Sequence, residues 1–469
     1  MPDQPSESQP VEKSSPLSLP VSDYPGEPKL KVLFLVLIVL LIGAAGFVAF
    51  RFFSPRLIKP PKTSLTYWGL WEPERVMGKI LAEWEKKHPE IKINYVRQSP
   101  QEYRERLQSA LARNEGPDIF RFHITWLPML KNELEPLPAS VMSARQFEKT
   151  YYPVAQEHLR AGGSYLGIPL MIDTLALYYN EEIFQAAGKS PPTTWEELRD
   201  LAKELTIRDE VGRIQRAGVA LGTTGNVDHW SDILGLMMLQ NGADLTKPDS
   251  CFQSKDGALP SAETCLGVDA LIFYTFFNQV DQVWDETLPS STLAFATGRL
   301  AMYFAPSWRV FNLKEINPNL RFRIAPVPQL PGTEVTWASF WVEGVAKRSE
   351  NKEAAWEFLK FLSSPQTMEK LYQAESQLRL FGEPYARVEM ASKLANDPMV
   401  APFLDQAPKA QTWYLCSRTF DNGINERMIK YFEDAVNSVN SGKNPQKALE
   451  TATQGVAQLL SQYGVTAGF

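Results

Sequence analysis

The stretch Gly167-Ile-Pro-Leu-Met-Ile-Asp-Thr-Leu-Ala-Leu-Tyr-Tyr-Asn180 decides how the rest of the chain is organised. A Gly-x-Pro turn enters a mostly apolar run that a single carboxylate, Asp173, interrupts. Apolar residues of high β propensity on both faces predict a strand that is buried on both sides. A lone carboxylate in such a strand is costly unless it is hydrogen-bonded or lines a wet cleft. We therefore expect this strand to cross between two lobes and to carry Asp173 into the cleft between them.

Length and composition indicate a folded protein of more than one domain. The chain has 469 residues, of which 44% are hydrophobic and 22% charged, and this length suits about two or three domains. A net charge of -6, without a cluster of Lys and Arg, argues against a nucleic-acid partner. The four histidines show no paired Cys/His spacing, so we predict neither a metal site nor another cofactor.

The first 62 residues contain a candidate membrane anchor. Residues 1–28 are rich in Ser, Pro, Gln and Glu and are predicted to form a disordered cytoplasmic tail. Residues 32–50 are uncharged and come close to the roughly 20 residues that a membrane helix needs, so we assign a transmembrane anchor to residues 29–53. Because this stretch exceeds the apolar region of a typical cleaved signal, we favour an uncleaved anchor. A Pro-rich stem is predicted at residues 54–62.

The globular part begins at residue 63 with alternating strand and helix signals. Strands are predicted at residues 65–68, 91–96 and 119–122, and helices lie between them. This order predicts a parallel α/β sheet with right-handed crossovers. Ligands of such sheets bind at the carboxyl ends of the strands, which here include the loops at residues 69–72 and 123–126. A further Pro-containing strand at residues 322–328 is the predicted return crossing.

The three cysteines leave one question open. Cys251 and Cys265 bracket a polar segment that an exported domain could bridge with a disulfide. Spacing alone does not decide whether the bridge forms. Cys416 is expected to be a buried thiol and not a reactive one.

The placement of tryptophan is the most informative signal for function. Eight of the 12 Trp residues fall at predicted strand ends or loops, often beside a polar residue. Sugars present apolar C–H faces and rings of hydroxyls, which suit aromatic platforms with polar groups between them. The acids nearest the expected cleft are Glu72, Asp118, Asp173 and Asp228. An alternative is a glycoside-cleaving enzyme that uses Glu72 with Asp173 or Asp118, since two carboxylates suffice for that reaction.

From about residue 63 to the C-terminus, the chain resembles the family 1 extracellular solute-binding proteins of ABC transporters, which include maltose-binding protein and other sugar receptors. Order and spacing carry the resemblance, since no single motif is very specific. The matching pieces are Leu65-Thr-Tyr-Trp68, Gly116-Pro-Asp-Ile-Phe120, the stretch at residues 167–180, Pro192-Thr-Thr-Trp-Glu-Glu-Leu198, Gly298-Arg-Leu-Ala-Met302 followed by Trp308, and Ala355-Trp-Glu-Phe-Leu359.

The resemblance implies a type II periplasmic-binding-protein-like fold, an α/β architecture whose two lobes close on a ligand by hinge motion. Lobe 1 is expected at residues 63–170 and 328–380, and lobe 2 at residues 171–327 and 381–469. The resemblance also implies a sugar-binding carboxylate at Asp173 and a stacking ring at Trp308. With the residues noted above, the candidate ligand-binding set is Trp68, Trp71, Glu72, Asp118, His123, Trp126, Asp173, His229, Trp230, Trp308, Trp341 and Trp413.

We therefore predict a membrane-anchored, extracytoplasmic receptor that binds a carbohydrate, an oligosaccharide by preference, and passes it to the permease subunits of an ABC transporter. It is not expected to be an enzyme. The chain departs from the family pattern in its retained membrane helix and in the segment between Cys251 and Cys265, which looks inserted. A permease-independent surface sensor or scavenger of the same fold is the nearest alternative.

Overall fold

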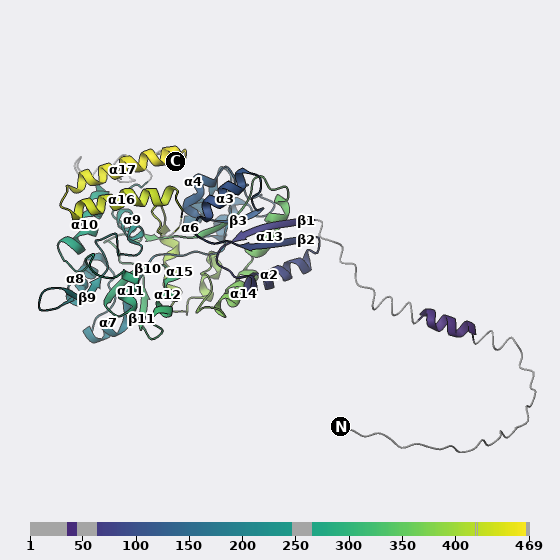
Figure 1. The fold of residues 1–469 in the computed structure, drawn as a ribbon, viewed down its shortest axis with the longest axis horizontal. Helices are drawn as coiled ribbons and strands as arrows, with labels where there is room; N and C mark the ends of the chain where they lie inside the picture. Colours follow the sequence, from purple (N-terminus) through teal and green to yellow (C-terminus); the bar gives the residue numbers. More distant parts are fainter. Residues whose placement is uncertain (1–34, 45–62, 246–264, 418, 420, 466–469) are drawn as a thin grey trace, which may run out of the picture. The chain divides into compact units, whose positions relative to one another are not determined.

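The computed structural model describes residues 35–44, 63–245, 265–417, 419 and 421–465. The chain forms two compact units, Met1–Pro60 and Pro61–Phe469, of which the second contains all the labelled elements discussed below (Figure 1). In the first unit, residues 35–44 form a helix with exposed side chains. Among the described residues, no helix combines the length and the apolar character needed to cross a membrane. The predicted tail, the stem and the two ends of the predicted anchor lie outside the described residues, as does Cys251.

Lobe 1 is built on a five-stranded sheet with the order β2-β1-β3-β13-β6. Strands β1 (Thr63–Gly69), β2 (Ile91–Arg97) and β3 (Ile119–His123) are parallel. Helices α2 (Glu74–Lys87) and α3 (Tyr103–Ala112) connect them, and Figure 1 shows these helices on opposite sides of the strands. The predicted strand–helix alternation is therefore confirmed.

Strand β13 (Trp341–Val345) completes lobe 1 from a distant part of the sequence. It lies between β3 and β6 (Ile168–Pro169) and is antiparallel to both. Helices α13 (Lys352–Leu362) and α14 (Pro365–Ser376) follow and pack against α2. The remaining short elements of this lobe are η1 (Ile124–Trp126), α4 (Leu127–Leu130), α5 (Ala144–Thr150), α6 (Pro153–His158), β4 (Arg160–Ala161) and β5 (Ser164–Tyr165).

Lobe 2 contains a second five-stranded sheet with the order β11-β7-β10-β9-β8. The strands are β7 (Ala176–Asn180), β8 (Ile207–Arg208), β9 (Ile214–Val219), β10 (Leu300–Ala305) and β11 (Phe322–Ala325). Its helices are α7 (Glu181–Ala187), α8 (Trp195–Leu205), α9 (Trp230–Gln240), α10 (Leu266–Gln279), α11 (Ser291–Ala296) and α12 (Arg309–Ile316). Thr194 and Glu197 form a capping box at the start of α8, as the Thr-x-x-Glu spacing predicts.

The stretch at residues 167–180 crosses between the two sheets, as predicted, but it does so as two strands and not as one. Strand β6 belongs to the first sheet and β7 to the second. Between them, Met171 pairs with Tyr385 and Thr174 with Ala338 in isolated bridges. The ladder changes partners because the segment passes from one sheet to the other. The return runs from β11 through β12 (Thr336–Trp337) to β13.

The C-terminal part contributes helices to the outside of lobe 2. Helices α16 (Ile424–Asn440) and α17 (Pro445–Gln462) pack on each other and on α10; Figure 1 shows them together in yellow. The elements between α14 and α16 are η3 (Val388–Lys393), α15 (Ala401–Gln406), η4 (Ala407–Lys409) and β14 (Ala410–Gln411), which pairs with β12.

Lobe 1 encloses a buried ion triad. The Arg121 guanidinium lies 2.8 Å from a Glu72 carboxylate oxygen and 2.6 Å from one of Glu343, and each of these side chains is 1% exposed. Burial alone disfavours all three charges, whereas the opposite charges favour one another. The pKa of Arg121 is raised because the attraction of the Glu343 and Glu72 carboxylates outweighs the opposing effect of burial. Glu72 is therefore held by Arg121 as a structural part of the lobe 1 core.

Candidate ligand-binding site

A cavity of about 380 Å³ lies between the two lobes, and its volume suits a small-molecule ligand. Lobe 1 supplies residues from the loop after β1, from the end of β3 and from the start of β13. Lobe 2 supplies residues from the loop after β10 and from α12, and the crossing segment supplies its floor. The lining residues are Trp71, His123, Met171, Asp173, Pro306, Trp308, Asn312, Ser339, Trp341, Arg379, Glu383, Cys416, Ser417 and Thr419.

Asp173 is fixed at the floor of this cavity by three donors. Its carboxylate accepts hydrogen bonds from the backbone amide of Ser307 at 3.0 Å, from the Ser307 hydroxyl at 2.9 Å and from the Thr174 amide at 2.9 Å. Burial raises the pKa of Asp173 to about 8, although the Ser307 and Thr174 donors act in the opposite direction. The negative charge of Glu383 adds to the rise. At neutral pH this group can therefore carry a proton, so that it both donates and accepts hydrogen bonds.

Aromatic rings from both lobes form the walls. The Trp71 and Trp341 rings of lobe 1 meet edge to face with centroids 5.7 Å apart, and Trp126 supports Trp341 from behind at 5.1 Å. In lobe 2, Trp308 precedes α12, and the Arg309 guanidinium lies 4.5 Å from the centre of its ring. Trp71, Trp308 and Trp341 are large, rigid and partly apolar surfaces that the two lobes contribute to one cavity, and such surfaces suit stacking on a flat ligand.

The wall that includes His123 consists of uncharged polar groups. His123 Nε2 lies 3.0 Å from the Ser339 hydroxyl, and Nδ1 lies 2.7 Å from the Thr125 hydroxyl. Burial lowers the pKa of His123 to about 3, so the imidazole is neutral. Cys416 is a buried free cysteine, as expected, and its Sγ lies 3.0 Å from the Ser339 oxygen. Burial raises the pKa of its thiol, so this wall offers neutral donors and acceptors.

A charged corner completes the cavity at its lobe 1 side. Arg379 pairs with Glu383 at 2.7 Å and with Glu375 at 3.0 Å. Burial raises the pKa of Glu375 to about 8, and the neighbouring Glu383 carboxylate adds to the rise. Arg379 and Glu383 were not predicted from the sequence, because two isolated charges in a loop that follows a helix carry no local sign of a binding site.

Five of the twelve predicted residues line the cavity: Trp71, His123, Asp173, Trp308 and Trp341. Two others lie behind the lining. Trp126 is fully buried against Trp341. His229 contacts the Trp308 ring with centroids 5.6 Å apart and accepts a hydrogen bond from the Arg309 guanidinium at 3.0 Å. In this structure they pack against the Trp341 and Trp308 rings from outside the cavity lining.

The remaining five predicted residues lie elsewhere. Glu72 belongs to the buried triad, and Asp118 precedes β3, at the opposite end of that strand from the cavity, where it accepts hydrogen bonds from the Thr66 amide and the Ser349 hydroxyl. Trp68 packs against Tyr103, with ring centroids 6.4 Å apart. Trp230 and Trp413 are buried, the first at the start of α9 and the second against Phe432.

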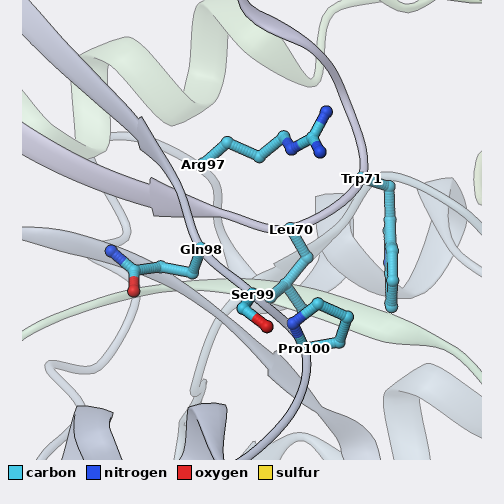
Figure 2. Close-up of a pocket in the computed structure, with 6 residues that line it drawn as sticks. All are labelled: Leu70, Trp71, Arg97, Gln98, Ser99 and Pro100. Atoms are coloured by element: carbon cyan, nitrogen blue, oxygen red, sulfur yellow. The ribbon is translucent and has the colours of Figure 1, made fainter.

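A second hollow of about 400 Å³ shares Trp71 with the cavity. Figure 2 shows its lining, in which Arg97 extends toward the segment that carries Trp71, whereas Gln98 points the other way. The lining residues, which come from the loop after β1, the end of β2 and the loop after it, are Leu70, Trp71, Arg97, Gln98, Ser99 and Pro100. Since lobe 2 contributes nothing to it, closure of the lobes would not enclose a ligand there.

The family model described as "Bacterial extracellular solute-binding protein" matches residues 72–369, more than half of the chain. The chain belongs to the bacterial extracellular solute-binding proteins. This solute-binding protein has relatives whose sequences are only 22% to 27% identical to it. A stretch of 225 residues is 27% identical to a Brucella abortus protein provisionally named as a binding protein, and spans 50% of that protein's length and 45% of this chain. The maltotriose-binding protein of Pyrococcus abyssi is 22% identical over 356 residues, which are 72% of this chain and 70% of that protein.

Solved structures of similar fold confirm the two-lobe α/β architecture of this solute-binding protein. The sugar-binding protein MalE of Xanthomonas citri is 22% identical, with a TM-score of 0.68, and the match covers 85% of this chain and 98% of the other. A cyclo/maltodextrin-binding protein complexed with maltotetraose is 20% identical, with a TM-score of 0.67, and the match covers 85% and 97%. At these identities the likeness establishes the fold alone. Among the described residues, no group of three or more His, Cys, Asp or Glu side chains could hold a metal ion.

Proposed function

We propose that this solute-binding protein captures a carbohydrate, an oligosaccharide by preference, in the cavity between its lobes and delivers it to an ABC transporter. One observation carries the proposal: tryptophan rings from both lobes and the hydrogen-bonded Asp173 line a single cavity. Sugar rings stack on indole faces through their C–H groups, while their hydroxyls need donors and acceptors at the edge. The sugar ligands in the names of several relatives support the same reading.

Binding and release follow from the two-lobe construction. A sugar would rest on Trp71 or Trp341 of lobe 1 and meet Trp308 when lobe 2 closes over it. Asp173 would accept hydroxyl hydrogen bonds at the floor, with Ser417, Thr419 and Asn312 as further polar partners at the edge. Closure buries the ligand between the two sets of rings, so a ligand that contacts both lobes favours the closed form. A permease can then recognise the closed form.

The proposal includes an N-terminal anchor that places the binding unit outside the membrane. Its support is the uncharged stretch at residues 32–50 in the sequence, whose length is close to the roughly 20 residues of a membrane helix. A long folded domain can be translocated regardless of the charges beside such a helix. Protease treatment of intact spheroplasts tests this arrangement, because it should remove the binding unit and leave only an N-terminal fragment.

A binding role without chemistry fits the site better than glycoside hydrolysis does. The relatives named above are binding proteins. Glu72, the acid proposed as a partner of Asp173 for such a reaction, is held by Arg121 in the core of lobe 1. Asp118 is held by the Thr66 amide and the Ser349 hydroxyl. Neither carboxylate lines the cavity that contains Asp173.

A thermal-shift screen of the full chain tests the function. The panel consists of sugars named with the structural neighbours, including maltotriose, maltotetraose, mannobiose and tagatose. A ligand that binds only the folded protein raises its melting temperature by an amount that grows with its concentration relative to its Kd. Chromatography of the same mixtures shows whether the sugar is cleaved. A rise without cleavage supports the proposal. If no sugar of the panel raises the melting temperature, or if the bound sugar is hydrolysed, the proposal is wrong.

A further inference from the structure

The loop that follows α14 packs on this lobe 1 helix as far as Glu383, beyond the predicted lobe boundary at residue 380. It touches α12 of lobe 2 through two ring contacts. The Phe381 and Phe311 rings lie with their centroids 4.6 Å apart. The Arg379 guanidinium lies 4.9 Å from the centre of the same Phe311 ring. In Figure 1, α12 and α14 occupy the same lower edge of the molecule, one in each lobe. Protein side chains therefore join the two lobes without a ligand, at a point that is separate from the crossing segments.

The lobe 1 half of this contact is held rigidly. Arg379 is paired on both sides, with Glu375 on α14 and with Glu383 further along the loop. Phe381 is 2% exposed. The loop packs so closely on α14 that a Cβ atom at Gly382 would lie 2.6 Å from the backbone of Tyr372. The guanidinium and the Phe381 ring thus form a preformed seat for Phe311.

The lobe 2 half of the contact is on the helix that presents ligand-facing groups. Phe311 is next to Asn312 on α12, and Trp308 precedes the same helix. Both Trp308 and Asn312 line the cavity, as Arg379 and Glu383 do from the other lobe. Whatever fixes Phe311 also fixes the position of Trp308 and Asn312 relative to lobe 1.

We propose that Phe311, Phe381 and Arg379 form an interlobe clasp that holds the cleft closed independently of the solute and so positions Trp308 and Asn312 over the cavity. Arg379 is a positioning residue in this scheme, acting through Phe311. Aromatic pairs and cation–π contacts are strong enough to shift a two-state equilibrium by about tenfold. The inference rests on the two-lobe fold and is independent of which solute the protein binds.

Cys416 provides the readout, because it lines the cavity and is 3% exposed. N-ethylmaleimide reaches this thiol only when the cleft opens, so the labelling rate at fixed pH reports the open fraction. The full chain, without added solute, is labelled, digested and analysed by mass spectrometry, so that only the peptide containing Cys416 is counted. Phe311→Ala should raise the labelling rate about tenfold, and Phe311→Tyr, which keeps the ring, should restore the wild-type rate.

Lobe 2 offers matched controls for both types of side chain. Phe273 is a half-buried phenylalanine of lobe 2, and among the described residues its ring contacts those of Trp195 and Phe277. Arg199 lies 5.4 Å from the centre of the Phe276 ring and pairs with Asp281. It therefore combines a ring contact with an acidic partner, as Arg379 does. Phe273→Ala and Arg199→Gln should lower the melting temperature without changing the labelling rate of Cys416, whereas Arg379→Gln should raise that rate.

The Cys416 labelling rates of these variants test the proposal. If Phe311→Ala and Phe273→Ala give the same labelling rate, or if Phe311→Tyr labels as fast as Phe311→Ala, no clasp exists. Should Phe311→Ala fail to fold, Phe311→Leu and Arg379→Gln provide the same comparison, and wild-type labelling rates in both would overturn the proposal. Because no sugar is used, this result is independent of the outcome of the sugar screen.

Discussion

The Asp173 carboxylate accepts hydrogen bonds from both the backbone amide and the hydroxyl of Ser307, at 3.0 and 2.9 Å. These residues are 134 positions apart in the sequence, and their contact joins the crossing segment to the loop that carries Trp308. The ionisation of one carboxyl group is thereby linked to the position of the loop that carries the Trp308 ring.

Asp173→Asn should make the stability of the protein less dependent on pH. The pKa of Asp173 is about 8 in the folded protein against a usual value of 3.8, so the folded state binds more protons than the unfolded state between these values. The free energy of unfolding therefore falls as pH rises, by about 1.4 kcal/mol per pH unit for this group. Urea unfolding of both proteins at pH 5 and pH 8 measures the effect. From pH 5 to pH 8 the free energy of unfolding should fall less in the variant than in the wild type.

The comparison isolates Asp173 from other buried acids. The pKa of Glu375 is also raised to about 8 by burial, and those of Asp232 and Asp421 to about 6, but these groups are present in both proteins. Any hydrogen-bond mismatch that the new amide causes at position 173 affects both pH values about equally. A difference between variant and wild type that is the same at pH 5 and pH 8 would contradict the assignment.

Ser307→Ala should destabilise the protein more at high pH than at low pH. The Ser307 hydroxyl donates to the Asp173 carboxylate and lowers the pKa of Asp173. Removing the hydroxyl therefore destabilises the folded protein most when Asp173 is ionised. The expected loss is about 1 to 3 kcal/mol above pH 8, since hydrogen bonds to charged groups are among the stronger ones. Repeating the substitution in the Asp173→Asn background closes a double-mutant cycle. There the effect of Ser307→Ala should lose its pH dependence.

Trp308→Ala should weaken sugar binding by at least about tenfold, because a stacking face contributes roughly 1 kcal/mol or more beyond its buried area. Trp68→Ala is a matched control, since Trp68 is likewise half-buried but packs against Tyr103 outside the cavity lining. Isothermal titration with the sugar found in the screen gives both affinities. Equal affinities for the two variants would remove Trp308 from the site.

Glu72→Gln should lower the stability but leave sugar affinity unchanged, because Glu72 is part of the Arg121 triad and not of the cavity. Removing one partner of a buried ion pair typically costs about 3 to 5 kcal/mol of stability. Because the neutral amide of Gln keeps one acceptor oxygen, the loss of stability in Glu72→Gln should lie at the lower end of that range or below it. Urea unfolding and titration with the same sugar test the two halves of this prediction separately. If the variant lost sugar affinity and kept the wild-type stability, Glu72 would be a ligand-binding residue and the prediction would be wrong.

The sequence predicts the crossing of residues 167–180 because its apolar composition and its lone acid are local properties. It does not separate Asp173 from Glu72, since what distinguishes them is a partner far along the chain: Arg121 is 49 residues from Glu72. For the same reason, Trp126 and Trp341 look alike in sequence although one supports the other. Arg379 and Glu383 escape prediction because only the fold brings their loop to the cavity.

The ion triad also sets an order of events during synthesis. Arg121 and Glu343 are 222 residues apart, and β13, which carries Glu343, lies between β3 and β6 in the sheet. At the usual 5 to 20 residues per second, a nascent chain carries Arg121 for roughly 10 to 45 s before its second carboxylate is made. Until β13 is made, β3 and β6 lack the strand that joins them, so lobe 1 cannot finish folding before most of lobe 2 has been synthesised. A nascent chain with two unpaired strand edges is a natural client for a holding chaperone.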